Sequence, residues 1–136
     1  SCADGHLLAY GLDSWTADFE RTLENVIAEI KPLGVYTVIA HPFRNDRSRE
    51  HFEHLMTLDF DGVETASCNT DELAGSIALE FAEARRLPML ESSDAHNVDM
   101  LGGHATLFEG DIRDMTALLK ALRAGDFSPA SLCLRP

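Results

Sequence analysis

The chain alternates between short apolar runs and longer segments in which apolar residues recur at helical spacing. Residues 35–40 form a β-branched and aromatic run with apolar side chains on both faces, which is typical of a strand covered on two sides in a parallel sheet. Further strands are predicted at 61–65 and 89–93. Residues 70–86 carry apolar side chains on one face and form the clearest predicted helix.

The remaining segments continue this alternation of strands and helices. A first helix is expected to begin after Asp13 or Ser14 and to reach about Lys31. The other predicted elements are strands at 6–10 and 105–108 and helices at 50–58 and 115–122. Strands that alternate with helices predict parallel βα units joined by right-handed crossovers. We therefore expect a single α/β domain over residues 1–136.

Composition narrows the classes of function. The 136 residues are 45% apolar, enough for one core, and 23 acidic against 11 basic residues give a net charge of -12, which makes nucleic acid an unlikely partner. No apolar run approaches the roughly 20 residues of a membrane helix. Cys2, Cys68 and Cys133 are widely spaced and form no CxxC pair, which favours a reducing, cytoplasmic location.

Each of the three central strands leads to a potential ligand at its C-terminal end. His41 follows the first strand, Glu64 lies at the end of the second, and Asp94 with His96 follows the third. In parallel α/β sheets and barrels, ligands bind at this edge. Pro42 holds the backbone of His41 out of the helical region and ends the strand.

Two imidazoles and one carboxylate suit a catalytic Zn²⁺, Mn²⁺ or Fe²⁺. If Ala95 is extended, Asp94 and His96 point to the same side and can share one ion. A lone His-Pro is more often a strand terminator, and a lone Asp-x-His is more often a cap or turn. Their joint placement after separate strands favours a metal site of His41, Asp94 and His96.

Other polar residues complete the expected site. An unpaired Glu64 would be costly to bury, so it is expected to orient His41 or Asp94, hold a second metal, accept a proton, or bond to the loop of Asn69. Arg44 is the best candidate to clamp a phosphate. His104 and His6 are weaker candidates for substrate contact, and His51 and His54 fit a surface helix better than a metal site.

Four stretches together resemble the polymerase and histidinol phosphatase (PHP) family: residues 36–44, 61–65, 87–96 and 102–108. The resemblance covers about residues 6–110 and implies the C-terminal part of a distorted (β/α)7 barrel. It also implies two or three divalent metal ions at the strand ends and phosphoesterase activity. By this resemblance His41 falls at the third family motif, and Asp94 with His96 at the fourth, all as metal ligands.

The first two family motifs are absent from the chain. The first is a His-x-His, which none of the six histidines forms, and the second supplies further histidines and a bridging glutamate. The chain therefore resembles only the C-terminal half of the domain. Because a half-barrel exposes sheet edges, we expect a missing N-terminal segment or a second copy as partner.

Three hypotheses remain open from the sequence. The first is a metal-dependent phosphoesterase that hydrolyses a small phosphorylated substrate with metal-activated water, with Arg44 on the phosphate. The second is a non-catalytic, PHP-derived structural or regulatory module that assembles through an exposed sheet edge. The third is a metal-free anion-binding domain that uses the arginine loop.

Overall fold

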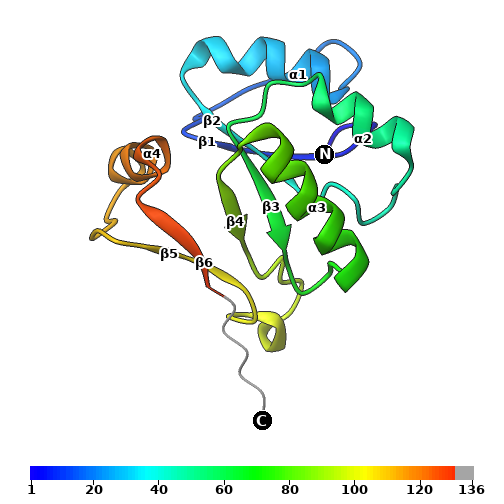
Figure 1. Cartoon of the computed structure of the whole chain (residues 1–136). Coiled ribbons are helices and arrows are strands. Elements are labelled where there is room, and N and C mark those ends of the chain that lie inside the picture. The colour runs from blue at the N-terminus through cyan, green and yellow to red at the C-terminus, as the bar shows by residue number, and fades with distance from the viewer. Residues whose placement is uncertain (131–136) are drawn as a thin grey trace.

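A four-stranded sheet forms the centre of the structure, a computed structural model that describes residues 1–130 (Figure 1). Its strands, in spatial order, are β1 (His6–Tyr10), β2 (Tyr36–Ala40), β3 (Gly62–Ala66) and β4 (Met89–Glu91). Strands β2, β3 and β4 are parallel, which confirms the predicted βα units. Strand β1 instead pairs antiparallel with β2, and His6 lies opposite Ala40. The start of β1 is thereby placed beside the C-terminal end of β2.

Three helices pack on one side of this sheet (Figure 1): α1 (Leu23–Ile30), α2 (Arg49–Met56) and α3 (Glu72–Arg85). Each begins after a residue whose side chain accepts a hydrogen bond from the amide three residues later: Thr22, Ser48 and Asp71. The predicted start of the first helix near residue 14 is wrong. Thr22 caps the helix, and Asp4 also accepts a hydrogen bond from the Leu23 amide at 2.7 Å. Leu12 and Trp15 pack against the core without being helical.

A second, two-stranded sheet lies on the other side of the central sheet (Figure 1). Strands β5 (Ala105–Phe108) and β6 (Phe127–Ala130) are antiparallel, and helix α4 (Met115–Ala124) lies between them in the chain. The sequence does not predict strand β6, because the adjacent Ser128 and Pro129, both exposed, interrupt its hydrophobic alternation. The fold is therefore mixed α/β with parallel βα units. A closed (β/α)7 barrel is not confirmed.

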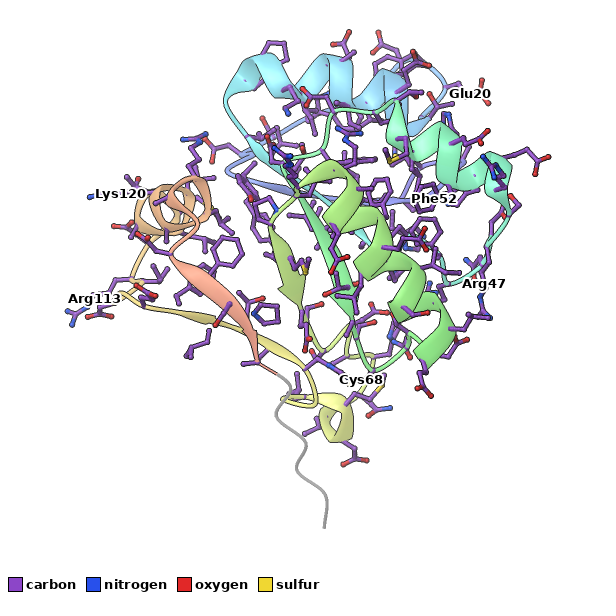
Figure 2. The ribbon with its side chains drawn as sticks, viewed as in Figure 1. Glu20, Arg47, Phe52, Cys68, Arg113 and Lys120 are labelled. Carbon is purple, nitrogen blue, oxygen red and sulfur yellow. The ribbon has the colours of Figure 1, made fainter. Side chains whose placement is uncertain are left out.

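The apolar core divides along the two faces of β2. Ile39 faces α2 and α3, where it joins a cluster that includes Phe43 and Phe81. Val38, the next residue along the strand, packs on the other face with Leu122 of α4. Phe52 of α2, which Figure 2 labels, stacks on Phe43 with ring centroids 5.6 Å apart. This two-sided burial is what the apolar run at 35–40 predicts.

Two sequence-based expectations concern location. Cys2 and Cys68 are free thiols, whereas Cys133 lies outside the described residues. No helix within residues 1–130 is both long and apolar enough to cross a membrane.

Asp61, just before β3, joins the N-terminal ends of two strands. Its Oδ2 accepts hydrogen bonds from the amide and the hydroxyl of Thr37, each at 2.8 Å, and its Oδ1 accepts one from Lys31 Nζ at 2.9 Å. Burial opposes the shift, but the hydrogen bonds from Thr37 and Lys31 hold the pKa of Asp61 below its usual value.

Replacing Asp61→Asn is expected to lower the free energy of unfolding by about 1–3 kcal/mol at pH 7, because an amide group cannot accept all three bonds. The folded-state pKa lies below the unfolded value of about 3.9, so this stabilisation is present above about pH 4 and is lost as the pH falls further. Urea unfolding at a series of pH values measures the difference.

Asp59→Asn is the matched control, because Asp59 also pairs with Lys31 at 2.9 Å but its side chain is 76% exposed. We expect a change below about 1 kcal/mol there. Equal losses in the two variants would contradict this account of Asp61.

Candidate functional site

The C-terminal ends of β2, β3 and β4 lie at one end of the sheet, which Cys68 marks in Figure 2. Three non-glycine residues of the described chain have a positive φ: His41 (32°), Asp94 (45°) and Arg86, which closes α3. Outside glycine this conformation costs about 1 kcal/mol or more, and such strain collects at functional sites. Two of the three predicted metal ligands are therefore the two strained residues at strand ends.

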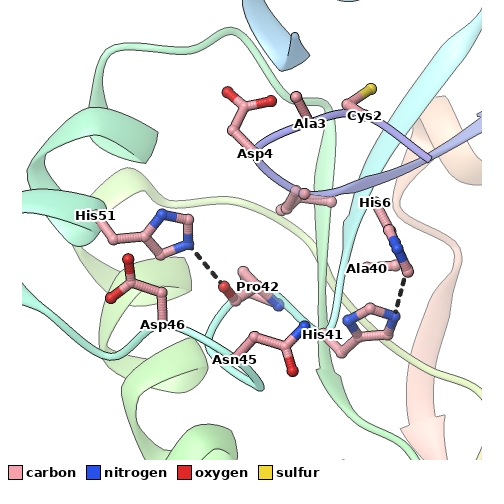
Figure 3. A pocket seen from close by; sticks show the side chains of 12 residues that line it. Cys2, Ala3, Asp4, His6, Ala40, His41, Pro42, Asn45, Asp46 and His51 are labelled. Atoms are coloured by element: carbon pink, nitrogen blue, oxygen red, sulfur yellow. Dashed lines mark hydrogen bonds between the residues drawn. The ribbon is translucent and has the colours of Figure 1, made fainter. Parts of the chain in front are cut away.

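His41 is buried and contacts His6. Its Nε2 lies 3.1 Å from His6 Nδ1, and the two rings meet edge to face (Figure 3). Burial, followed by the positive charge of Arg44, lowers the pKa of His41. The ring is thus neutral at pH 7, which is the form that binds a metal ion. Sequence reasoning assigned His6 to substrate contact and missed this pairing, because it depends on the antiparallel placement of β1.

Glu64 links the ends of the three parallel strands. Glu64 is only 3% exposed. Its Oε2 accepts a hydrogen bond from the backbone amide of His41 at 2.9 Å, and its Oε1 accepts one from the hydroxyl of Ser92. Burial raises the pKa of Glu64 although both hydrogen bonds oppose the shift. Glu64 therefore fixes the backbone of His41 and leaves the imidazole free to bind elsewhere.

Asp94 is held by a guanidinium group and an amide. Arg44 donates to Asp94 Oδ2 at 3.0 Å, and Asn69 Nδ2 donates to the same oxygen at 2.8 Å. Burial opposes the shift, but the hydrogen bond from Asn69 and the nearby positive charge of Arg44 hold the pKa of Asp94 below its usual value. Asn69, expected near Glu64, thus bonds to Asp94.

His96 is exposed, and its Nδ1 lies 2.9 Å from the backbone oxygen of Asp94. Asn69 Nδ2 lies 3.4 Å from the same nitrogen, but the contact with the carbonyl oxygen is shorter, and a carbonyl oxygen only accepts. We therefore assign Nδ1 as the donor and the lone pair to Nε2. Metal-binding histidines commonly make this second hydrogen bond.

Three further histidines also make specific contacts. His51 Nε2 donates to the backbone oxygen of Pro42 at 2.9 Å and braces the turn after His41, a role that the sequence did not reveal. His54 Nε2 lies 3.2 Å from Asp4. His104 Nδ1 lies 3.0 Å from Glu91 Oε2.

A polar cavity of about 330 Å³ opens beside the His6–His41 pair (Figure 3). Asp4 and Cys2 border it on the N-terminal side, and Asp46 borders it on the loop after β2. The two imidazoles are thus reachable from a cavity large enough for a small ligand.

The His and Asp side chains at this edge of the sheet supply some of the ligands that a metal ion needs. Within residues 1–130, no three His, Cys, Asp or Glu side chains are grouped closely enough to hold one. The 3.1 Å between the nitrogens of His6 and His41 is close to the spacing of two ligands at about 2.0–2.1 Å from one ion. Arg44 and Asn69 both donate to Oδ2 of Asp94, which leaves Oδ1 as the carboxylate oxygen for a metal ion within residues 1–130. The described residues therefore supply part of a metal site.

Comparison with known proteins confirms the resemblance to the PHP family in one region: residues 73–127 match the model of the PHP-associated family. No curated protein matches the chain. Among solved structures, PsfC from Pseudomonas syringae PB-5123 is similar with a TM-score of 0.62 and 22% identity, over 90% of this chain and 50% of PsfC. A candidate metal-dependent phosphoesterase from Bifidobacterium adolescentis gives a TM-score of 0.48 and 25% identity, over 64% of this chain and 32% of that one.

The comparison with PsfC shows a shared fold and a difference in chain length. At 22% identity, the similarity to PsfC shows that the two chains share a fold. This chain spans about half the length of PsfC.

The backbone strain at His41 can be tested by a pair of substitutions that both remove the imidazole. We expect His41→Gly to be more stable than His41→Ala by about 1 kcal/mol, because glycine adopts a positive φ without steric cost. Chemical denaturation of the two variants measures the difference. A His41→Ala variant as stable as His41→Gly would contradict the assignment of strain to this residue.

Proposed function

We propose that this chain contributes one side of the active site of a metal-dependent phosphoesterase that acts on a small phosphorylated substrate. The observation that carries the proposal is the backbone strain at His41 and Asp94, which follow β2 and β4, the two strands on either side of β3. A residue keeps a strained backbone only where the surrounding structure holds it in that conformation, and such residues cluster at active sites. The match to the PHP-associated family over residues 73–127 supports the same conclusion.

In this proposal His41, Asp94 and His96 hold the metal, and His6, which contacts His41, is a further candidate ligand. Nitrogen and carboxylate oxygen donors suit Zn²⁺, Mn²⁺ or Fe²⁺. When bound, such an ion lowers the pKa of water and stabilises the charge that develops on phosphoryl oxygens.

Arg44 binds the phosphate in this proposal. Within residues 1–130, one nitrogen of its guanidinium donates to Asp94, so several of its five N–H groups remain for another acceptor. Paired hydrogen bonds to phosphate oxygens match the planar shape of the guanidinium. In a chain of net charge -12, this local cation gives an anionic substrate a favourable place to bind.

Glu64 serves the reaction through its buried carboxylate. It positions His41 by accepting the hydrogen bond of its amide. Its raised pKa also makes it able to take up a proton released by the attacking water.

The remaining ligands come, in this proposal, from an N-terminal segment or a second copy of the chain. The donors within residues 1–130 group in pairs and no closer, and the chain spans half the length of PsfC. Strand β1 lies at an edge of the sheet, where such a partner can pair.

Metal content and turnover, measured together, test the proposal. Protein expressed from the complete reading frame is expected to bind divalent metal and to hydrolyse 4-nitrophenyl phosphate or bis(4-nitrophenyl) phosphate. His96→Ala is expected to weaken metal binding and turnover by at least about tenfold, because it removes a ligand.

His54→Ala is the matched control, because His54 pairs with Asp4 on the surface, and it should keep both properties. Full metal content and activity in His96→Ala would refute the ligand assignment. Bound metal without turnover would favour the non-catalytic module, and phosphate binding that resists chelators would favour the metal-free anion-binding domain.

A further inference from the structure

A second cavity, of about 360 Å³, lies between the central sheet and the α4–β5 layer. Its lining is mostly apolar and includes Tyr10, Val38, Leu90, Phe108 and Leu118. Glu64 and Ser92 also line it. Glu64 also bonds to the amide of His41, so the cavity adjoins the candidate metal site at Glu64.

Glu91 and His104 form a polar pair in the wall of this cavity. His104 Nδ1 lies 3.0 Å from Glu91 Oε2. The side chain of His104 is 27% exposed and that of Glu91 is 13% exposed. A carboxylate oxygen accepts, so Nδ1 donates and Nε2 is left to exchange a proton. Within residues 1–130, no group forms a hydrogen bond with Nε2 of His104.

Thr106 fixes this pair to the central sheet. Its hydroxyl accepts a hydrogen bond from the amide of Glu91 at 3.1 Å and donates one to the carbonyl of Glu91 at 2.9 Å. A single side chain thus satisfies both backbone groups of Glu91. The carboxylate at the end of β4 and the imidazole just before β5 are therefore held where this hydroxyl joins the two strands, which suits a proton-transfer group.

We propose that the apolar cavity binds the alcohol portion of the substrate and that His104, positioned by Glu91, protonates the leaving oxygen. This inference rests on the proposed phosphoesterase function and deepens it. The substrate class is a phosphoester of an apolar or aromatic alcohol, because a cavity with this lining favours such a group over a charged one.

The proton and electron balance of the step is simple. The oxygen of water forms a bond to phosphorus and releases a proton to solvent. The bond between phosphorus and the alcohol oxygen breaks, and its electron pair stays on that oxygen. The imidazolium of His104 gives its Nε2 proton to the same oxygen, and solvent restores it afterwards. Glu91 acts through His104 and is a positioning residue in this step.

Leaving-group dependence tests the role of His104 in the complete, metal-loaded protein. Phenyl phosphate needs a proton on its leaving oxygen, whereas 4-nitrophenyl phosphate needs it far less. We expect His104→Gln to lower kcat for the phenyl ester by about 100-fold or more and for the nitrophenyl ester by less than about fivefold. Glu91→Gln should show the same selective loss to a smaller extent, and His54→Gln should change neither rate.

Equal losses on both esters, or none on either, would overturn the proton-transfer role. A merely structural role for Glu91 would lower both rates in parallel, so the ratio of the two rates separates positioning from folding.

Binding of inert phosphonates tests the cavity without turnover. Calorimetry is expected to show phenylphosphonate binding at least about tenfold more tightly than methylphosphonate, because the ring is buried. Leu118→Trp, which fills the cavity, should abolish that preference, and Leu107→Trp, on the exposed side of β5, should retain it. Equal binding of the two phosphonates would overturn the cavity assignment.

The ester kinetics and the phosphonate binding together also distinguish a failure of this inference from a failure of the proposed phosphoesterase function. If the wild-type protein hydrolyses neither ester but still prefers phenylphosphonate, the phosphoesterase function and the role of His104 both fail, while the cavity assignment holds. If both esters are hydrolysed with no phosphonate preference, the function holds and the cavity assignment fails.

Discussion

The buried carboxylate of Glu64 is the interaction on which the geometry of the site depends. Its two oxygens accept hydrogen bonds from the His41 amide, at the end of β2, and from the Ser92 hydroxyl, after β4. A carboxylate that is almost fully buried requires such partners, because leaving it unpaired would cost several kcal/mol. One side chain of the middle strand therefore fixes both neighbouring strand ends and borders the apolar cavity as well.

An ion pair and two residues with a strained backbone lie near the carboxylate of Glu64. The chain as a whole is acidic, yet Arg44 and Asn69 direct their donors at Asp94. His41 and Asp94 both keep a positive φ, and the contacts around them offset its cost. A phosphate bound to Arg44 and a cation bound to Asp94 would both lie at this ion pair, so the two ligands are expected to influence one another at this point.

The sequence predicts this site to the extent that local pattern sets it. Apolar runs predict β2, β3 and β4, and parallel pairing then gathers His41, Glu64 and Asp94 at one edge, as the structure shows. The roles of these residues as ligands stay predictions.

What the sequence does not predict depends on tertiary contacts. The antiparallel pairing of β1 places His6 beside His41, and the contact of Asn69 with Asp94 joins loops 25 residues apart. Strand β6 lacks hydrophobic alternation and is defined by its pairing with β5.

Diffraction from crystals of the complete, metal-loaded protein, with anomalous scattering measured at the absorption edge of the metal, tests the central claim most directly. The account predicts an ion about 2.0–2.2 Å from a ring nitrogen of His41 and from a carboxylate oxygen of Asp94. An ion bound elsewhere, with the His6–His41 and Arg44–Asp94 contacts both intact, would contradict it.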